Sequence, residues 1–361
     1  MTDVAHPYNA LHVTSNGKAR GSIFDQALLS FATVVFGSEH HQGQIVERGY
    51  LSHEQALKTL NQALSRPDCA QHDEIVLSIV MLGILESIVP TSPGSYVHHL
   101  TGLNELLKLR DPLLHITPKS LHIYKSIRHL ILFSSLRTCT ASVFARPDWK
   151  AVLRIGCTEE QLAEQEIWDV LADCSVLQAQ CLASSTELGI CADQRIATDA
   201  MVLLKTLYAW RAQFDDNATH AYRLLPNQRR EQVQGLALPA AYEFAKDSTA
   251  ITITLYNTTL IHVLQLLQTL HGSVGSPDFG PDILDDLDTA VIDAASEVCR
   301  CVPHFIGLRP EAIPGCTPII HWAVSTVWNI LRHLNTVEAQ WLDNLVRSEK
   351  GKFLARGLFS E

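Results

Sequence analysis

Apolar residues recur at intervals of three and four along most of the chain, which is the spacing of one face of an α-helix. The clearest case is the segment 95–112, whose apolar face consists of Val97, Leu100, Leu103, Leu106 and Leu107. Pro112 disfavours helical backbone at the residue before it, so this helix is expected to end near Asp111. Gly102 in mid-helix costs about 1 kcal/mol relative to alanine. We therefore predict that another helix approaches closely at Gly102.

The same periodicity predicts helices along the rest of the chain. In a capping box, a hydroxyl and a Gln side chain three residues later satisfy the free backbone N–H groups at the start of a helix. Two segments fit this pattern and predict helix starts, Ser52–Gln55 and Thr158–Gln161. The helix predicted over 73–87 is apolar nearly all round, so other helices should cover it on several sides. The remaining predicted helices span 23–36, 118–144, 195–213, 239–270, 282–301, 318–334 and 337–346.

Strand signals are weak in this sequence. The nearest to an alternating pattern, Thr252–Leu255, lies inside a helical period. The polar segments 214–232 and 271–281 are predicted to be loops. The sequence thus predicts an all-α protein, a single multi-helix domain of about ten or more helices over residues 21–361, preceded by a loose N-terminal segment, 1–20.

Charge and composition restrict the partners. The chain has 38 acidic and 28 basic residues, a formal net charge of −10, and its one basic pair, Arg229–Arg230, is followed directly by Glu231. Nucleic-acid affinity depends on clustered lysine and arginine, so we expect no direct binding to nucleic acid. No segment has the composition of a signal peptide or the roughly 18 consecutive apolar residues of a membrane span. We expect a soluble, intracellular protein without a membrane partner.

Neither a metal nor a cofactor is predicted. The nine cysteines are scattered mostly through apolar helical sequence and contain no Cys-x-x-Cys pair, so we interpret them as reduced thiols. Cys299, Cys301 and His304 are close in sequence, but within one helical turn their side chains point apart. The run Asp285-Asp-Leu-Asp288 resembles the aspartate-rich magnesium motif of terpene synthases, with a spacing that differs by one residue. We interpret it as the solvated first turn of a helix, which favours acidic side chains.

Residues 96–110 resemble the part of fungal-specific transcription factor domains in which His-Leu-x-Gly precedes Leu-Leu-x-x-Arg. Five further segments are similar to that family in the same order: 56–64, 74–86, 242–267, 294–307 and 341–354. The resemblance implies the helical regulatory region of zinc binuclear cluster regulators. Those proteins normally bind DNA through six N-terminal cysteines and a basic linker, whereas here only Cys69 precedes Cys139. We therefore expect the regulatory domain without the zinc cluster. The segment 319–328 also departs from the proline-rich version common in the family.

Two function classes follow. The resemblance implies a regulator of a fungal secondary-metabolite gene cluster, in the nucleus or the cytoplasm, that acts through a DNA-binding partner, a homodimer or a hydrophobic small molecule. The alternative is a cofactor-free cyclase, isomerase or dehydratase of a natural-product pathway, because helical domains can hold apolar pockets. Histidine would then supply acid–base chemistry.

The sequence assigns no catalytic residue. Nucleophile-elbow, phosphate-loop and dinucleotide-binding motifs do not occur, which argues against hydrolase, NTPase and simple dehydrogenase activities. Four residues would line a ligand pocket if the family-like helices converge, and would otherwise occupy separate core or surface positions. These candidates are His99, His304, His321 and Trp322.

Overall fold

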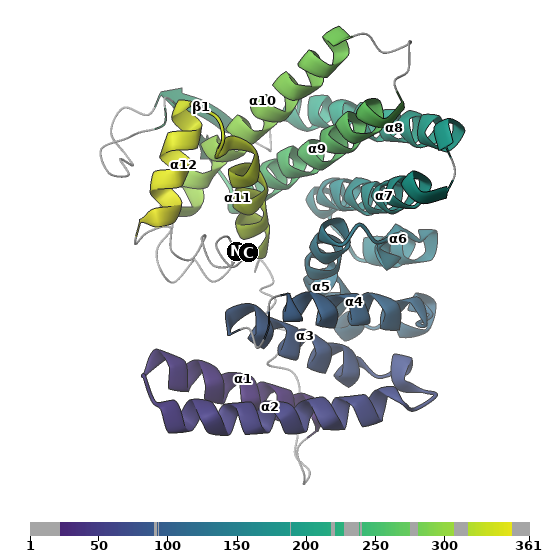
Figure 1. Ribbon diagram of the computed structural model, residues 1–361, viewed down its shortest axis with the longest axis vertical. Helices are drawn as coiled ribbons and strands as arrows, with labels where there is room; N and C mark the ends of the chain where they lie inside the picture. The colour runs from purple at the N-terminus through teal and green to yellow at the C-terminus, as the bar shows by residue number, and fades with distance from the viewer. Residues whose placement is uncertain are drawn as a thin grey trace. The chain divides into compact units, whose positions relative to one another are not determined.

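The structure is a computed structural model that describes residues 22–89, 92, 94–187, 189–217, 221–226, 238, 240–274, 281–306 and 317–348. This part of the chain forms twelve α-helices, three short 3₁₀ helices and one two-stranded sheet (Figure 1). The all-α prediction is confirmed. The segment 1–20, predicted to be loose, lies outside the described residues, as do residues 275–280 of the second predicted loop.

The described chain divides into two compact units. The N-terminal unit takes the described residues of 22–135 and 146–153, and the C-terminal unit takes those of 136–145 and 154–348. The chain therefore passes between the units three times, so neither unit is one uninterrupted segment.

A helical hairpin begins the N-terminal unit. Its two helices, α1 (Ile23–Glu39) and α2 (Gly43–Leu64), lie side by side (Figure 1). Two glycines allow the backbones to approach closely. A Cβ added at Gly49 would lie 2.5 Å from Val34 Cγ2, and one at Gly37 would lie 2.8 Å from Val46 Cγ2. The hairpin is thus held at a spacing that larger residues at Gly37 and Gly49 would not permit.

One of the two predicted capping boxes is present. Thr158 N–H donates to Gln161 Oε1 at 3.0 Å, the Gln161 N–H donates to Thr158 Oγ1 at 3.3 Å, and α7 (Glu159–Glu187) begins at the next residue. The helix start predicted at Ser52 is wrong, because Ser52 lies inside α2 and its Oγ donates to the Arg48 carbonyl oxygen at 3.0 Å. The preceding turns of α2 already occupy the backbone donors that a cap would satisfy.

Helix α3 (Asp73–Ile88), preceded by the 3₁₀ helix η2 (Cys69–Gln71), is buried on several sides, as predicted. It packs against α4 (Ser95–Lys108), but the close approach predicted at Gly102 is wrong. Gly102 is exposed, and an added Cβ would meet nothing within 4 Å. The close approach occurs instead at Gly83 of α3, where an added Cβ would lie 3.2 Å from His99 Cβ. After α4, the Asp111 side chain accepts from the Leu113 N–H and begins η3 (Pro112–His115).

Helix α5 (Pro118–Arg137) is shorter than the predicted 118–144, because Cys139 has a φ of 49°, a left-handed conformation that ends helices. The chain continues through η4 (Val143–Ala145) and α6 (Pro147–Arg154). Pro147 thus occupies the first position of a helix, where its missing N–H costs no hydrogen bond. In the N-terminal unit, Trp149 of α6 is fully buried and packs edge-on against Tyr124 of α5, with ring centroids 4.8 Å apart.

Helix α9 (Asp247–Val274) is the centre of the C-terminal unit. It packs against α7, α8 (Gly189–Asp215), α10 (Pro281–Ile306) and α11 (Thr317–Leu331), and α12 (Val337–Arg347) packs on α11. Three of its buried threonines, Thr252, Thr254 and Thr258, donate to carbonyl oxygens of their own helix; Thr258 Oγ1, for example, donates to the Thr254 carbonyl at 2.7 Å. Within the described residues, α9 alone is long and apolar enough to cross a membrane, but 83% of that window is buried inside the protein. Such burial is expected of a core helix.

Two short antiparallel strands, β1 (Tyr222–Pro226) and β2 (Ala240–Phe244), were not predicted. The sequence predicts a loop over 214–232, which is wrong at β1. It also predicts a helix from residue 239, whereas β2 occupies residues 240–244 and α9 begins only at Asp247. Tyr222 lies opposite Phe244, and their rings stack with centroids 5.7 Å apart. Such aromatic pairs across strands favour a sheet over the helix suggested by the local apolar spacing.

Candidate functional site

A buried polar cluster surrounds Glu86 in the N-terminal unit. Glu86 is 3% exposed, and its Oε2 accepts a hydrogen bond of 2.6 Å from Ser95 Oγ. Its other oxygen, Oε1, lies 3.1 Å from Nε2 of His53, which is 4% exposed. Tyr50 lies one turn before His53, and His99 lies one turn after Ser95. Below, the Glu86 cluster means Tyr50, His53, Glu86, Ser95 and His99.

Three helices position this cluster. Glu86 is the only acidic residue of α3 beyond its first turn, His53 lies on α2, and Ser95 is the first residue of α4. A carboxylate in an otherwise apolar helix is costly to bury unless it is hydrogen-bonded, and His53 and Ser95 meet that requirement. The isolated Glu86 is therefore the sequence signal that could have located the cluster, of which sequence reasoning selected only His99.

Burial is the largest influence on the ionisation of the cluster. It lowers the pKa of His99, and the positive forms of His53 and His98 lower it further, whereas Glu86 opposes them. Burial also raises the pKa of Tyr50, and the negative charge of Glu86 adds to that rise. The Nδ1 atom of His53 is buried and has no hydrogen-bond partner among the described residues. The cluster thus combines a carboxylate, two hydroxyls and two imidazoles, which are groups that can transfer protons.

His304 joins two helix ends in the C-terminal unit. It lies in the last turn of α10, and its Nε2 is 2.9 Å from Oδ1 of Asp247, the first residue of α9. Its ring packs edge-on against Phe244 of β2, at a centroid distance of 5.3 Å. An acidic side chain at a helix N-terminus and an imidazole at a helix C-terminus both complement the helix dipoles. This arrangement gives His304 a structural role at the start of α9.

Trp322 and His321 lie on α11. Trp322 stacks on His262 of α9 with ring centroids 5.2 Å apart, and burial lowers the pKa of His262 to about 4. Asp247 and His262, the α9 partners of His304 and Trp322, are 15 residues apart. Because an α-helix rises 1.5 Å per residue, these partners are about 22 Å apart along α9. His304 and Trp322 therefore lie at different places in the C-terminal unit, and His99 belongs to the N-terminal unit.

The cysteines and aspartates considered as metal ligands are Cys299 and Cys301 near the end of α10 and Asp285 and Asp288 near its start. Among the described residues, no three His, Cys, Asp or Glu side chains are grouped to hold a metal ion. Cys299 and Cys301 are fully buried, and burial raises the pKa of both thiols, that of Cys301 to about 12. Metal ligation requires the thiolate, so neutral thiols fit a packing role. Asp285 and Asp288 are exposed near the start of α10, and Asp288 accepts from Gln268 Nε2 at 2.6 Å.

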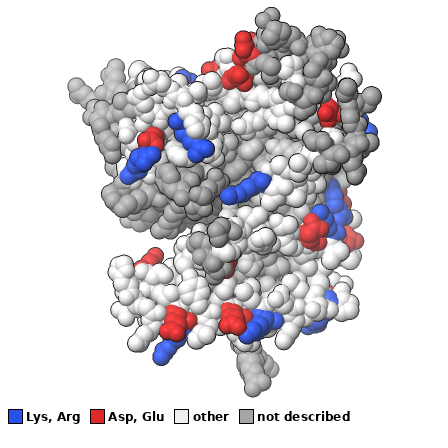
Figure 2. All heavy atoms as spheres, in the orientation of Figure 1, with Lys and Arg blue, Asp and Glu red and all other residues white. Residues whose placement is uncertain are grey.

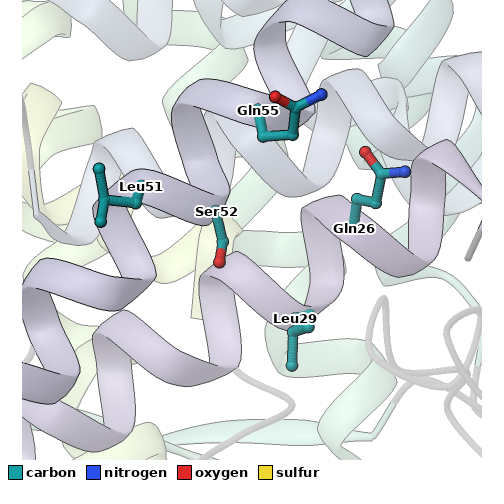
Figure 3. A pocket seen from close by; sticks show the side chains of 5 residues that line it. All are labelled: Gln26, Leu29, Leu51, Ser52 and Gln55. Carbon is teal, nitrogen blue, oxygen red and sulfur yellow. The ribbon is translucent and has the colours of Figure 1, made fainter.

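A shallow pocket of about 290 Å³ lies on the hairpin between α1 and α2 (Figure 3). Two large apolar side chains border it at the solvent, Leu29 at 61% exposure and Leu51 at 62%. The lining contains no titratable group and consists of Gln26 and Leu29 from α1 and Leu51, Ser52 and Gln55 from α2. This lining can bind an apolar side chain and offer a few hydrogen bonds, but it has no group for acid–base catalysis.

Charged side chains are scattered over the face of the molecule in Figure 2. Blue and red side chains lie singly or beside one another, and the described part of this face has no continuous basic area. Exposed ion pairs such as Lys58–Glu54 and Lys108–Glu105, each with an N–O distance of 2.6 Å, are typical of the surface. The described part of this face therefore presents no basic patch of the kind that binds a phosphate backbone.

Fold and site together define an all-α protein with a buried polar cluster and an apolar surface pocket. No family model matches the chain, and no solved structure matches it. The chain is similar to the uncharacterized protein AN5342 of Emericella nidulans, with 25% identity over 217 residues. The match covers 58% of this chain and 46% of that protein, so the chain spans about half the length of the curated relative it matches.

Proposed function

We propose that the chain is a regulatory protein of the fungal transcription factor type, without a zinc cluster in these 361 residues, that controls a secondary-metabolite gene cluster through a protein partner. It would act in the nucleus or the cytoplasm. The relative from Emericella nidulans is a fungal protein, which agrees with a fungal setting for such a regulator.

The packing of the family-like segments also supports the proposal. Segments 56–64, 74–86 and 96–110 coincide with parts of α2, α3 and α4, and α3 packs against both of the other helices. Arg110, which matches the last residue of the family motif, is 2% exposed and forms an ion pair with Asp73 of α3. The second oxygen of Asp73 accepts from Ser120 Oγ at 2.9 Å. The motif arginine thus ties the segment after α4 to the starts of α3 and α5.

The observation that carries the proposal is the α1–α2 pocket. Pockets for small molecules usually enclose roughly 300–1,000 Å³ and converge on a few polar or charged groups. The pocket between α1 and α2 has a volume at the lower end of this range, is shallow and free of titratable residues, and is bordered by exposed leucines. Exposed apolar side chains around a shallow pocket are typical of a surface that binds another protein.

Transcript and metabolite profiling of a strain that lacks the gene tests the proposal. The strain should show lower transcript levels for the genes of one biosynthetic cluster, and the full-length protein should restore them. A Leu51→Asp variant, which places a charge in the pocket, should restore them poorly. A Leu182→Asp variant changes an equally prominent leucine of α7, 57% exposed, and should restore them fully. Normal transcripts beside a lost metabolite would refute the regulatory proposal.

The Glu86 cluster favours the second candidate, a cofactor-free enzyme that cyclises, isomerises or dehydrates a hydrophobic metabolite. Burial lowers the pKa of His99 and so favours the neutral imidazole, the form that accepts a proton, and Ser95, Glu86 and His53 form a chain of hydrogen-bonded groups. This arrangement supplies proton-transfer groups but no residue that would bind the substrate.

Product formation in extracts distinguishes the second candidate from the first. For an enzyme, His99→Ala should reduce product formation at least tenfold, because a positioned acid–base group contributes roughly 10²–10⁴-fold. His304→Ala removes the Asp247 pair and leaves the Glu86 cluster intact, so it should retain the activity if the protein remains folded. Product formation that survives His99→Ala would exclude this residue as the acid–base group.

A further inference from the structure

The segment that joins α4 to α5 displays several apolar side chains to solvent. Leu109 and Leu114 are 75% and 76% exposed, the largest values for any large apolar side chain among the described residues, and Leu113 is exposed as well. Within η3 (Pro112–His115), Pro112 is the one buried residue. Apart from Pro112, η3 therefore contributes little apolar burial that would hold it in place.

A hydrogen bond from a buried arginine connects η3 to the helices of the N-terminal unit. Arg110 Nη2 lies 3.0 Å from Nδ1 of His115, and the same nitrogen pairs with Asp73 of α3. The Arg110 side chain is fully buried, whereas His115 is partly exposed. A guanidinium has five N–H donors and no acceptor, and it does not lose its charge in proteins. Nδ1 of His115 must therefore accept this bond, which it can do only while that nitrogen carries no proton.

The charged groups around His115 act in two directions. Burial and the positive charge of Arg110 lower the pKa of His115. The carboxylates of Asp73 and Asp111 oppose this shift but do not cancel it. Both carboxylates have other partners, because Asp73 pairs with Arg110 and Asp111 accepts from the Leu113 N–H at 2.9 Å. A protonated His115 would thus face the Arg110 guanidinium at close range, and the two like charges would repel each other.

We infer that the Arg110–His115 bond is a pH-sensitive switch, which keeps η3 docked while His115 is neutral and releases it when His115 is protonated. The proton binds at Nδ1 and removes the acceptor on which the bond depends. Arg110 keeps its pair with Asp73, so the release is confined to η3 and leaves the packing of α3 on α4 unchanged. The switch thus couples pH to the conformation of the segment that carries the exposed leucines Leu113 and Leu114.

The direction of the response follows from the two protonation states of His115. In the released segment the imidazole has its ordinary pKa of about 6.5, and the docked imidazole takes up a proton only at a lower pH. Segment η3 is therefore held above about pH 6.5 and is released progressively as the pH falls below that value. If the docked form takes up no proton, the ratio of released to docked η3 rises about 30-fold between pH 7.5 and pH 5.

Hydrogen-exchange mass spectrometry of the full chain at pH 5, 6 and 7.5 tests the switch, with rates corrected for the intrinsic pH dependence of exchange. The amides of Leu113 and Leu114 both donate to Asp111 in the docked segment. We expect their protection to fall at least fivefold from pH 7.5 to pH 5. Peptides from α3 should keep their protection, which distinguishes local release from unfolding of the N-terminal unit.

The variant His115→Asn isolates the titrating group. The amide oxygen of asparagine takes the place of Nδ1 and accepts from Arg110 at every pH, so the loss of protection on acidification should disappear. His115→Ala removes the acceptor, so η3 should be poorly protected at pH 7.5 as well as at pH 5. His122→Asn changes another partly exposed histidine, on α5, and should keep the full response. Circular dichroism verifies that each variant remains folded.

Protection of η3 that does not change between pH 7.5 and pH 5 would overturn the inference, as would a His115→Asn variant that responds like the original chain. Nitrogen NMR of the histidine rings gives a direct check of the bond. At pH 7.5, Nδ1 of His115 should be the nitrogen without a proton, and a proton on Nδ1 would contradict the switch.

Discussion

Glu86 shows how a single buried residue can connect three helices. Replacing it with alanine would leave the Ser95 hydroxyl and the His53 imidazole without their acceptor in a buried site. We expect Glu86→Ala to lower the free energy of unfolding by about 3 kcal/mol, as is typical when one member of a buried polar pair is removed. Glu86→Gln retains the shape and one acceptor oxygen, so its effect should be smaller. Urea unfolding at pH 7 measures both changes.

The matched control for Glu86 is Glu105→Ala. Glu105 lies on the exposed side of α4 and pairs with Lys108 at the surface, with its side chain 59% exposed. Surface ion pairs contribute little, so this substitution should change the free energy of unfolding by less than about 0.5 kcal/mol. Equal effects of the two substitutions would contradict the buried role assigned to Glu86.

Buried histidines should make the stability depend on pH. Burial lowers the pKa of His129 to about 3 and that of His262 to about 4, and it also lowers that of His99. Because the unfolded chain then binds more protons, stability is complete above the unfolded pKa of about 6.5 and falls as the pH decreases below it. For His129, which is 8% exposed, the loss at pH 5 should be about 2 kcal/mol.

The variant His129→Leu checks this sign. Unfolding by urea at pH 5, 6 and 7 should show that the variant loses less stability on acidification than the original chain does, by about 2 kcal/mol at pH 5. An unchanged pH dependence would mean that His129 has no lowered pKa in the folded protein.

At the scale of helices, glycines distinguish close contacts from open surface. Gly49→Ala in α2 would place a Cβ 2.5 Å from Val34 Cγ2 and 2.8 Å from the Val34 backbone nitrogen, so the hairpin would have to separate. We expect a loss of about 1–3 kcal/mol in the free energy of unfolding. Gly102→Ala in α4 meets nothing within 4 Å and gains helix propensity, so it should stabilise the protein by about 0.5–1 kcal/mol.

Thermal unfolding of the two glycine variants gives the comparison directly. The melting temperature of Gly102→Ala should rise, and that of Gly49→Ala should fall. A fall in both would mean that α4 is covered at Gly102, as the sequence alone had suggested.

Helices were predictable from the sequence wherever periodicity and end signals agreed. The pattern around Leu100 and Leu103 and the capping box at Thr158 lead directly to α4 and α7. Sequence spacing did not predict β1 and β2, because the pairing of Tyr222 with Phe244 joins residues 22 positions apart. It also could not locate Gly83 as the close contact, because that depends on which side of α3 faces His99.

The candidate sites show the same limit. His99 was found as a histidine in a family-like motif, but its surroundings depend on Glu86 and His53, which come from two other helices. His304 and Trp322 were grouped by residue type alone, and the structure places them against points on α9 about 22 Å apart. Local sequence identifies reactive residue types, whereas the packing of distant segments determines which of them meet.

At the scale of the whole molecule, the interleaving of the two units determines which fragments can fold. The N-terminal unit includes α6, which follows ten residues that belong to the C-terminal unit. Trp149 of α6 and Tyr124 of α5 are both fully buried and in edge-on contact. A fragment that ends at residue 135 keeps Tyr124 but loses the tryptophan that covers it, whereas a fragment that ends at residue 153 keeps both.

We therefore expect residues 22–153 to form a helical fragment that unfolds cooperatively, and residues 22–135 to be less stable by about 3–5 kcal/mol, the usual cost of removing a buried tryptophan. Circular dichroism with urea unfolding compares the two fragments. In the full chain, Trp149→Ala removes the same contact without changing the chain length, so it should destabilise the N-terminal unit by a similar amount. Fragments of equal stability would show that α6 is not part of the N-terminal core, and the boundary of that unit would then lie at residue 135.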